Sequence, residues 1–188
     1  CSSIETMAFA MHALMQEVRA EPFLVLGHSM GGYITLAMAA QQPSCIKAFG
    51  LLHSTAFADS DEKKATRIKS IEFIKENGGY AFLKTAIPGL FAKTFATAHE
   101  EIVNQLVEKG KSFSPDVLIA YYQAMIARPD RTQVLKAAKC PVLFLIGDED
   151  KAAPMQDVLQ QVHLPVASDI KILRNTGHMG MLEQPTLT

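Results

Sequence analysis

Pro22-Phe23-Leu24-Val25-Leu26-Gly27-His28-Ser29-Met30-Gly31-Gly32 is the most informative pattern in this chain. Apolar, β-prone residues lead into Gly-His-Ser-Met-Gly, and a helical pattern follows over residues 33–41. The order strand, sharp turn, helix predicts a nucleophile elbow, with Ser29 held clear of the sheet on a strained backbone. Gly27 and Gly31 flank the serine, and we expect a larger side chain at either position to collide with the turn.

Length, composition and charge set limits on what the protein is. The 188 residues are enough for one ordinary domain with a sizeable core, and 48% are hydrophobic while 20% are charged. A net charge of −1 gives no electrostatic basis for binding nucleic acid or an anionic membrane. No run of 18 apolar residues occurs, so no membrane-spanning segment is expected.

Four segments have the composition of β-strands, and they alternate with helical patterns, which predicts an α/β fold with a mostly parallel, doubly wound sheet. The predicted strands are residues 23–27, 46–52, 141–147 and 169–174. The third is an unbroken apolar run, as expected of a strand covered on both faces. The fourth alternates in part, which favours a position nearer the edge of the sheet.

Residues 58–139 contain no convincing strand and are predicted to form a helical cap inserted into the sheet. The chain then divides into a core segment 1–57 with the elbow, the cap 58–139, and a second core segment 140–188. Helix boundaries are predicted by capping boxes of Ser2 with Glu5 and of Thr97 with Glu100, and by Ser60. Further helices are predicted from Pro115 to Arg128 and over residues 154–162.

The elbow sequence Gly-His-Ser-Met-Gly-Gly resembles that of the α/β-hydrolase superfamily. This resemblance implies a serine nucleophile, an acid after a later strand, and a histidine after the last strand, in that order along the chain. Ser29 is then the nucleophile, and His178, in Asn175-Thr176-Gly177-His178, matches the histidine. Alternation along Gly147-Asp148-Glu149-Asp150 does not separate Asp148 from Asp150, but the resemblance favours Asp150 as the acid and leaves Asp148 as the alternative.

Five other histidines could in principle serve as the base, and their positions in the sequence make them weaker candidates than His178. His53 follows a central strand and is the one serious rival, whereas His28 is expected to pack beneath the elbow. The rest lie in helical or loop stretches and are interpreted as structural: His12, His99 and His163.

The oxyanion hole requires backbone N–H groups aimed at the developing negative charge, and Met30 supplies one of them. The resemblance places the second on a loop after an earlier strand, and no strand precedes Phe23 in this sequence. The elbow strand would also expose an unpaired apolar edge. We therefore expect two or three further strand–helix units upstream, about 60 to 90 residues at about 30 for each unit.

The predicted function is that of a serine hydrolase that cleaves a small apolar ester or related acyl compound through an acyl-enzyme. Residues 125–130, before the acid strand, resemble small bacterial hydrolases of the esterase, enol-lactonase and cofactor-free haloperoxidase type. A carbon–carbon bond hydrolase, a perhydrolase, and a non-enzymatic signalling or binding protein on this fold remain alternatives. The residues that could line an apolar acyl pocket, or simply form cap core, are Phe57, Phe82, Phe91, Phe95, Tyr121 and Met125.

No metal is predicted, because the three cysteines lack metal-ligand spacing, and no cofactor is predicted either. The same sparse, odd set is typical of reduced thiols in a cytoplasmic protein. The natural substrate and the oligomeric state are left open by the sequence.

Overall fold

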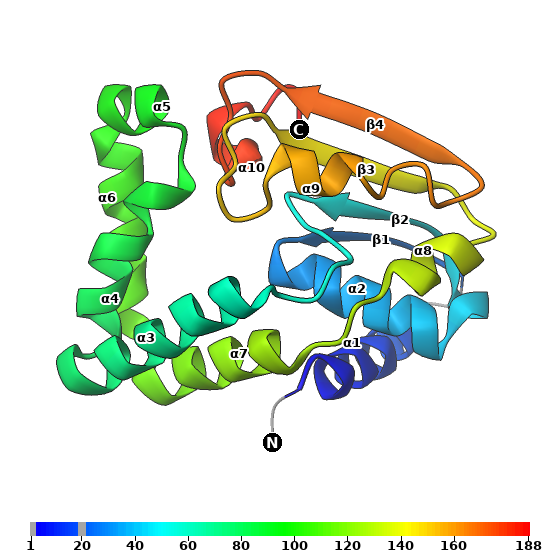
Figure 1. The fold of residues 1–188 in the computed structure, drawn as a ribbon, viewed down its shortest axis with the longest axis horizontal. Helices are drawn as coiled ribbons and strands as arrows, with labels where there is room; N and C mark the ends of the chain where they lie inside the picture. Colours follow the sequence, from blue (N-terminus) through cyan, green and yellow to red (C-terminus); the bar gives the residue numbers. More distant parts are fainter. Residues whose placement is uncertain (1–2, 19–21) are drawn as a thin grey trace.

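The computed structural model describes residues 3–18 and 22–188. Its described residues form a parallel sheet of four strands in the order β1-β2-β3-β4 (Figure 1). The strands are β1 (Phe23–His28), β2 (Ile46–Leu52), β3 (Val142–Gly147) and β4 (Ser168–Leu173). All four predicted strands are confirmed to within one residue at either end. Because the strands are parallel, their C-terminal ends meet at one edge of the sheet.

The centre of the core lies along β3, where Val142, Phe144 and Ile146 are buried as the apolar run predicts. Helix α2 (Met30–Gln41) packs against β1 and β2, and α1 (Ile4–Val18) packs against α2. Strand β4 lies at one edge of the sheet and exposes most of its residues, which confirms its predicted position. Strand β1 lies at the other edge among the described strands.

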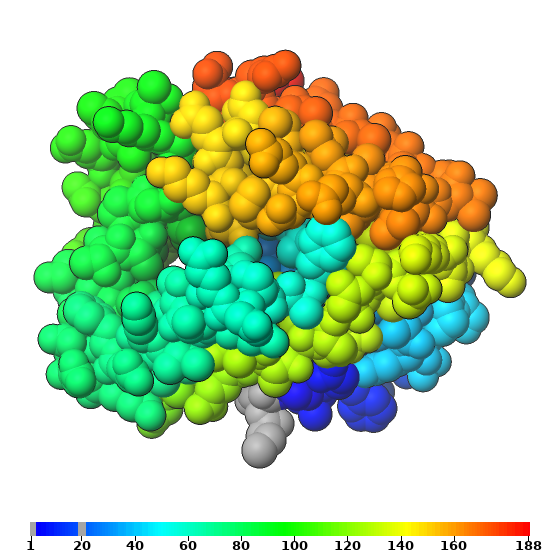
Figure 2. All heavy atoms as spheres, in the orientation of Figure 1, coloured from blue at the N-terminus to red at the C-terminus, as the bar shows by residue number. Residues whose placement is uncertain are grey.

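The helices between β2 and β3 confirm the prediction that no strand interrupts this part of the chain. They are α3 (Asp61–Asn77), α4 (Gly79–Ala86), α5 (Lys93–Ala98), α6 (Glu100–Lys109), α7 (Pro115–Ala127) and α8 (Thr132–Ala137). Figure 1 shows α4 to α6 facing the C-terminal ends of the strands, and Figure 2 shows these helices in contact with the C-terminal part of the chain. Leu135 of α8 belongs to the main core, whereas α4 to α6 contribute to a separate apolar cluster.

Helix ends test the predicted caps residue by residue. The hydroxyl of Ser60 accepts a hydrogen bond from the N–H of Lys63, so the predicted cap of α3 is confirmed. The predicted box with Ser2 lies outside the described residues. At this end of α1, Ser3 and Thr6 exchange the reciprocal bonds, with each side-chain oxygen accepting from the other residue's N–H at 2.9 and 3.1 Å.

Two predicted helix boundaries are wrong. Thr97 does not cap α6, because it lies within α5 and its hydroxyl donates to the carbonyl of Lys93. The helix predicted over residues 154–162 is shorter, α9 (Met155–Leu159). Gln161 is instead drawn into the core, where its side chain bonds to the hydroxyl of Thr55 and to the N–H of Ala56.

Candidate active site

Ser29 occupies the turn between β1 and α2. Its φ of 53° and ψ of −119° lie outside the regions preferred by L-residues, which confirms the predicted backbone strain. Its N–H donates to the carbonyl of Leu52 at 2.9 Å, and the hydroxyl of Ser54 donates to the carbonyl of Ser29 at 2.8 Å. The neighbouring strand β2 and the residues after it therefore hold the elbow in place.

The two elbow glycines differ in what they contribute. A Cβ atom at Gly27 would overlap the carbonyl of Gly31 and would lie 2.5 Å from Oγ1 of Thr35, so a larger residue is excluded there. A Cβ atom at Gly31 would have no described heavy atom within 4 Å. The predicted collision at Gly31 is therefore wrong, because this position in the first turn of α2 faces open space.

Ser29, His178 and Asp150 are brought together at the C-terminal ends of the strands. The hydroxyl oxygen of Ser29 lies 2.8 Å from Nε2 of His178, and Nδ1 of the same ring lies 2.8 Å from Oδ2 of Asp150. Because a carboxylate only accepts hydrogen bonds, Nδ1 carries the proton and Nε2 presents its lone pair to the serine hydroxyl. This tautomer is the one that a general base requires.

Asp150 is held rigidly and in its charged form. Its Oδ1 accepts hydrogen bonds from the N–H groups of Ala152 and Ala153 at 2.8 and 2.9 Å. Burial opposes ionisation, but the hydrogen bonds from His178 and His53 outweigh burial and hold the pKa of the Asp150 carboxyl well below its usual range. The carboxylate is therefore fully ionised at neutral pH.

Asp148, the alternative acid, binds the backbone near Thr176 and not the ring of His178. Its Oδ1 accepts a hydrogen bond from the N–H of Thr176 at 3.2 Å, and its Oδ2 lies 3.7 Å from Nη1 of Arg174. It thus contacts residues 175–179, the histidine loop between β4 and α10 (Gly180–Glu183), and not the imidazole itself.

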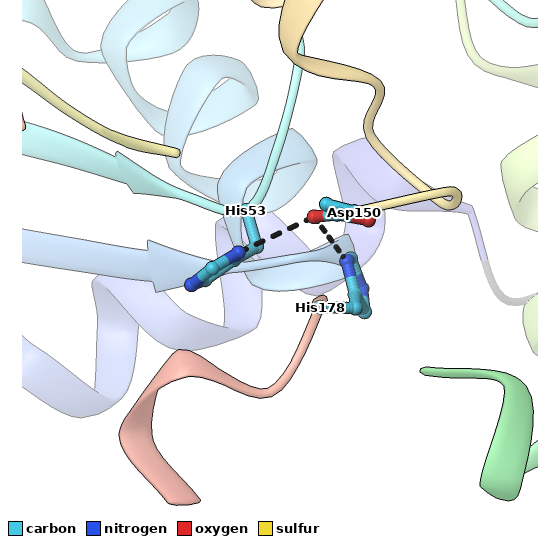
Figure 3. A group of neighbouring side chains, drawn as sticks. All are labelled: His53, Asp150 and His178. Carbon is cyan, nitrogen blue, oxygen red and sulfur yellow. Dashed lines mark hydrogen bonds and ion pairs between the residues drawn. The ribbon is translucent and has the colours of Figure 1, made fainter. Parts of the chain in front are cut away.

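Two further histidines lie close to His178. His28 Nε2 donates to the carbonyl oxygen of His178 at 2.8 Å, so the ring supports the histidine loop instead of filling space beneath the elbow. His53, the rival base, turns Nδ1 toward Oδ2 of Asp150 at 3.3 Å (Figure 3). Its buried Nε2 has no hydrogen-bond partner among the described residues. Of the two rival rings, His178 is the one that hydrogen-bonds to Ser29.

Glu183 joins the histidine loop to the helical segment. Its buried carboxylate accepts hydrogen bonds from the N–H groups of Gly177 and Met179 in the loop, at 3.0 and 3.1 Å, and from Ala92 at 2.8 Å. The N–H of His178 donates to the carbonyl of Leu90 at 2.6 Å. The orientation of His178 therefore depends on residues 90–92, which lie among the helices between β2 and β3.

Met30 begins α2, where the first N–H groups have no acceptor within the helix. The apolar residues proposed to line an acyl pocket are not gathered in one place. Phe91 and Phe95 stack in one cluster, Phe82 packs in a second, and Met125 packs against the main core. Phe57 and Tyr121 are half-buried.

Ligand atoms of His53, Asp150 and His178 lie within 4.8 Å of one another, close enough to be considered as a metal site. The bonds to a tetrahedral zinc ion are about 2.0 Å long, which keeps ligand atoms about 3.3 Å apart. The 2.8 Å separation of Nδ1 of His178 and Oδ2 of Asp150 is that of a direct hydrogen bond. Hydrogen bonding therefore accounts for the cluster.

Residues 4–188 match the alpha/beta hydrolase family along nearly the whole chain. The chain belongs to this family. It is 26% identical to a thermophilic esterase from Thermogutta terrifontis, with a TM-score of 0.90 over 98% of this chain and 68% of the esterase. It is also similar to the enol-lactonase of Burkholderia xenovorans, at 19% identity and a TM-score of 0.88 over 98% of this chain and 69% of the lactonase.

Among protein sequences, Lipase 1 of Psychrobacter immobilis is 24% identical over 95% of this chain and 57% of the lipase. The predicted family, the α/β-hydrolase fold and the prediction that this family member is a hydrolase are confirmed by these similarities. Within the described residues, no helix is both long enough and apolar enough to cross a membrane.

The sequence did not indicate the parts played by Ser54, His53 and Glu183. Glu183 carried one usable signal, since it is the one carboxylate after Arg174, in an otherwise uncharged stretch. A lone carboxylate beside a histidine loop is a candidate for binding backbone N–H groups. The contacts of Ser54 and His53 join the end of β2 to other strands, and no local pattern predicts contacts of that kind.

Proposed function

We propose that this chain is a serine hydrolase that cleaves a carboxylic ester or related acyl substrate through an acyl-enzyme. Ser29 is the nucleophile, His178 the general base and Asp150 the group that orients the imidazole. The observation that carries this proposal is the continuous hydrogen-bonded path from Oγ of Ser29 through His178 to Asp150, with 2.8 Å at each step.

The proposed reaction has two halves. In the first, Nε2 of His178 takes the hydroxyl proton as Oγ of Ser29 attacks the acyl carbon, and the imidazolium then gives this proton to the departing alcohol oxygen. In the second, His178 takes a proton from water, the hydroxide attacks the acyl-enzyme, and the proton returns to Oγ as the carboxylic acid leaves. Asp150 stays ionised throughout and stabilises the imidazolium.

We further propose that the N–H of Met30 stabilises the tetrahedral oxyanion, since it lies at the start of α2, directly after the nucleophile. Residues 58–139 are proposed to act as a cap, because α4 to α6 face the edge of the sheet that carries Ser29 (Figure 1). The scattered cysteines support a cytoplasmic location.

An ester is the favoured substrate class because the thermophilic esterase, at 26% identity, is similar along almost the whole of this chain. The other candidate is a lactone, which undergoes the same acyl transfer within a ring. The likeness to the enol-lactonase concerns the fold, so this alternative is a matter for direct assay.

The test is hydrolysis of 4-nitrophenyl esters of increasing acyl length, with an enol lactone in parallel, by the full chain and by Ser29→Ala. The variant should lose activity by a factor on the order of a million, because the hydroxyl performs the chemistry. Ser44→Ala, which alters an exposed serine away from the site, serves as the matched control. Substantial esterase activity in Ser29→Ala would refute the proposal.

A further inference from the structure

A second histidine lies against the carboxylate that orients His178. His53 follows β2, is 1% exposed, and has a φ of 49°, a backbone conformation that most side chains avoid. Its N–H donates to the carbonyl of Leu145 at 2.8 Å, which fixes it to β3. The backbone of His53 is therefore fixed to β3, and Nδ1 of its ring is directed at Asp150 (Figure 3).

The hydrogen bonds of His53 define its protonation state. Nδ1 lies 3.3 Å from Oδ2 of Asp150 and must donate, because the carboxylate is an acceptor. No described residue gives the buried Nε2 a hydrogen-bond partner, so a proton there would place an unpaired N–H in the core. The ring is accordingly neutral, with its single proton on Nδ1.

The Asp150 carboxylate accepts four hydrogen bonds from the described residues. Two backbone N–H groups bind Oδ1, while His178 and His53 share Oδ2 at 2.8 and 3.3 Å. A carboxylate offers about four acceptor positions, so none is left over. Because two donors share Oδ2, the negative charge that His178 experiences is smaller than it would be with one donor.

We propose, on the basis of the function proposed above, that His53 is a positioning residue that acts through Asp150 and tunes the basicity of His178. Removal of the His53 donor should leave Oδ2 to His178 alone, so that the imidazolium is held more tightly and the base is partly protonated at neutral pH. The titratable groups near this cluster include His28 from β1, Tyr33 from α2 and, behind the histidine loop, Asp148 after β3 and Glu183 from α10. None of them is changed in the variants below.

The test compares His53→Leu with His53→Asn in the full chain. Asparagine places an amide N–H at the same bond distance from the backbone as Nδ1 and tolerates a positive φ, whereas leucine has no donor. We expect the acid limb of the kcat/KM pH profile of His53→Leu to move upward by about half a unit, which lowers kcat/KM by up to about threefold on that limb. On the same limb His53→Asn should keep the kcat/KM of the wild type, with an unmoved limb, because its amide donor replaces the Nδ1–H group.

Gly180 provides a second route to the same result. A Cβ atom there would overlap Nε2 of His53, so Gly180→Ala should displace the ring and reproduce His53→Leu. The double variant His53→Asn, Gly180→Ala replaces the lost ring atoms with the new methyl group and should regain activity. If Gly180→Ala lowered activity without acting through His53, the double variant would be as impaired as Gly180→Ala alone.

Histidine NMR titration of the same variants in a Ser29→Ala background measures the ionisation of the His178 ring without relying on hydrolysis. The titration should move upward in His53→Leu and remain in place in His53→Asn. If the wild type proves inactive, the proposed function fails, yet this titration still tests the positioning role. Equal activity loss in both His53 variants with unmoved titration, or a fully active His53→Leu, would overturn the inference.

Discussion

Two carboxylates, Asp148 and Asp150, are separated by one residue but bind different groups. Asp150 holds the ring of His178 at 2.8 Å, and Asp148 holds the N–H of Thr176 in the histidine loop. Strand alternation predicts the same direction for both side chains and does not distinguish them. The difference arises because the chain turns after Gly147, and the N–H groups of Ala152 and Ala153 then fix the Asp150 carboxylate.

Replacement of each carboxylate by its amide tests which one orients the base. Asp150→Asn should reduce kcat by roughly ten-thousandfold, because the wrong tautomer of His178 becomes favoured. Asp148→Asn should reduce kcat by about tenfold or less, since it loosens only one backbone contact of the loop. The measurement is kcat at saturating activated ester, and the opposite ranking would show that Asp148 is the acid.

The elbow glycines give a second prediction at the scale of single residues. Gly27→Ala should destabilise the fold by about 1 to 3 kcal/mol, because the methyl group meets backbone atoms that have no room to move. Gly31→Ala should be neutral or stabilising by up to about 1 kcal/mol, because alanine suits a helix better than glycine. Urea unfolding of both variants measures the difference, and a strongly destabilised Gly31→Ala would contradict it.

At the scale of elements, the four strands and most helices were predictable because their apolar periodicity is local and strong. The Thr97 cap failed because a threonine hydroxyl also bonds to a carbonyl four residues earlier within a helix, as it does with Lys93. The C-terminal end of α9 was missed because tertiary contacts of Gln161 end the helix. The spacing of residues in the sequence predicts neither the start of α6 nor the end of α9.

The link between the histidine loop and residues 90–92 was also invisible in the sequence. Gly177 allows this contact, because a Cβ atom there would lie 2.5 Å from the N–H nitrogen of Ala92 and 2.7 Å from the carbonyl oxygen of Leu90. Glu183 then bonds to the N–H groups of both segments. A movement of the helical segment would therefore be transmitted to His178.

Glu183→Gln tests this coupling. The amide keeps one acceptor oxygen but loses the charge, so the free energy of unfolding should fall by about 1.5 to 3 kcal/mol. Turnover should fall at least tenfold, and proteolysis at residues 90–92 should become faster. Glu149→Gln, a change at an exposed carboxylate of the neighbouring loop, is the matched control. Unaltered turnover and proteolysis in Glu183→Gln would show that the two segments are not coupled.

At the scale of the whole molecule, a buried ion network joins the two ends of the helical segment, residues 58–139, to the core. Asp59, just before α3, accepts hydrogen bonds from Arg67 at 2.6 Å and from Arg128, just after α7, at 2.9 Å. The Arg128 guanidinium lies 3.8 Å from the ring centroid of Tyr33 in α2. Burial opposes the charge of Asp59, but both arginines outweigh it and lower the pKa of the carboxyl.

This lowered pKa makes stability depend on acidity. A carboxyl whose pKa is lower in the folded state stabilises the fold above the pKa of the unfolded chain, about 3.9, and loses this contribution as the pH falls further. Asp59→Asn should cost about 3 to 5 kcal/mol at pH 7, because it leaves Arg128 buried without its counter-ion. Urea unfolding between pH 7 and pH 3 should show a smaller acid dependence in the variant. If the free energy of unfolding of Asp59→Asn depended on pH as strongly as that of the wild type, this network would not be the source of the acid dependence.

The chain spans 68% of the thermophilic esterase and 57% of Lipase 1. Strand β1 lies at an edge of the described sheet, with Leu24 and Leu26 72% and 65% exposed. The resemblance of the elbow to the α/β-hydrolase superfamily implied the order Ser29, Asp150, His178, and parallel strands explain why residues so far apart in the chain meet at one edge. The contacts that orient these residues join segments up to 150 positions apart, and only the fold brings those segments together.

The most direct measurement of the central claim is intact-protein mass spectrometry of the full chain after treatment with a fluorophosphonate, followed by peptide mapping. A nucleophilic Ser29 activated by His178 predicts one adduct, located on the peptide that contains Ser29. The adduct should be absent from Ser29→Ala and strongly reduced in Asp150→Asn. No adduct on the wild type, or an adduct on another serine that persists in Ser29→Ala, would contradict the account.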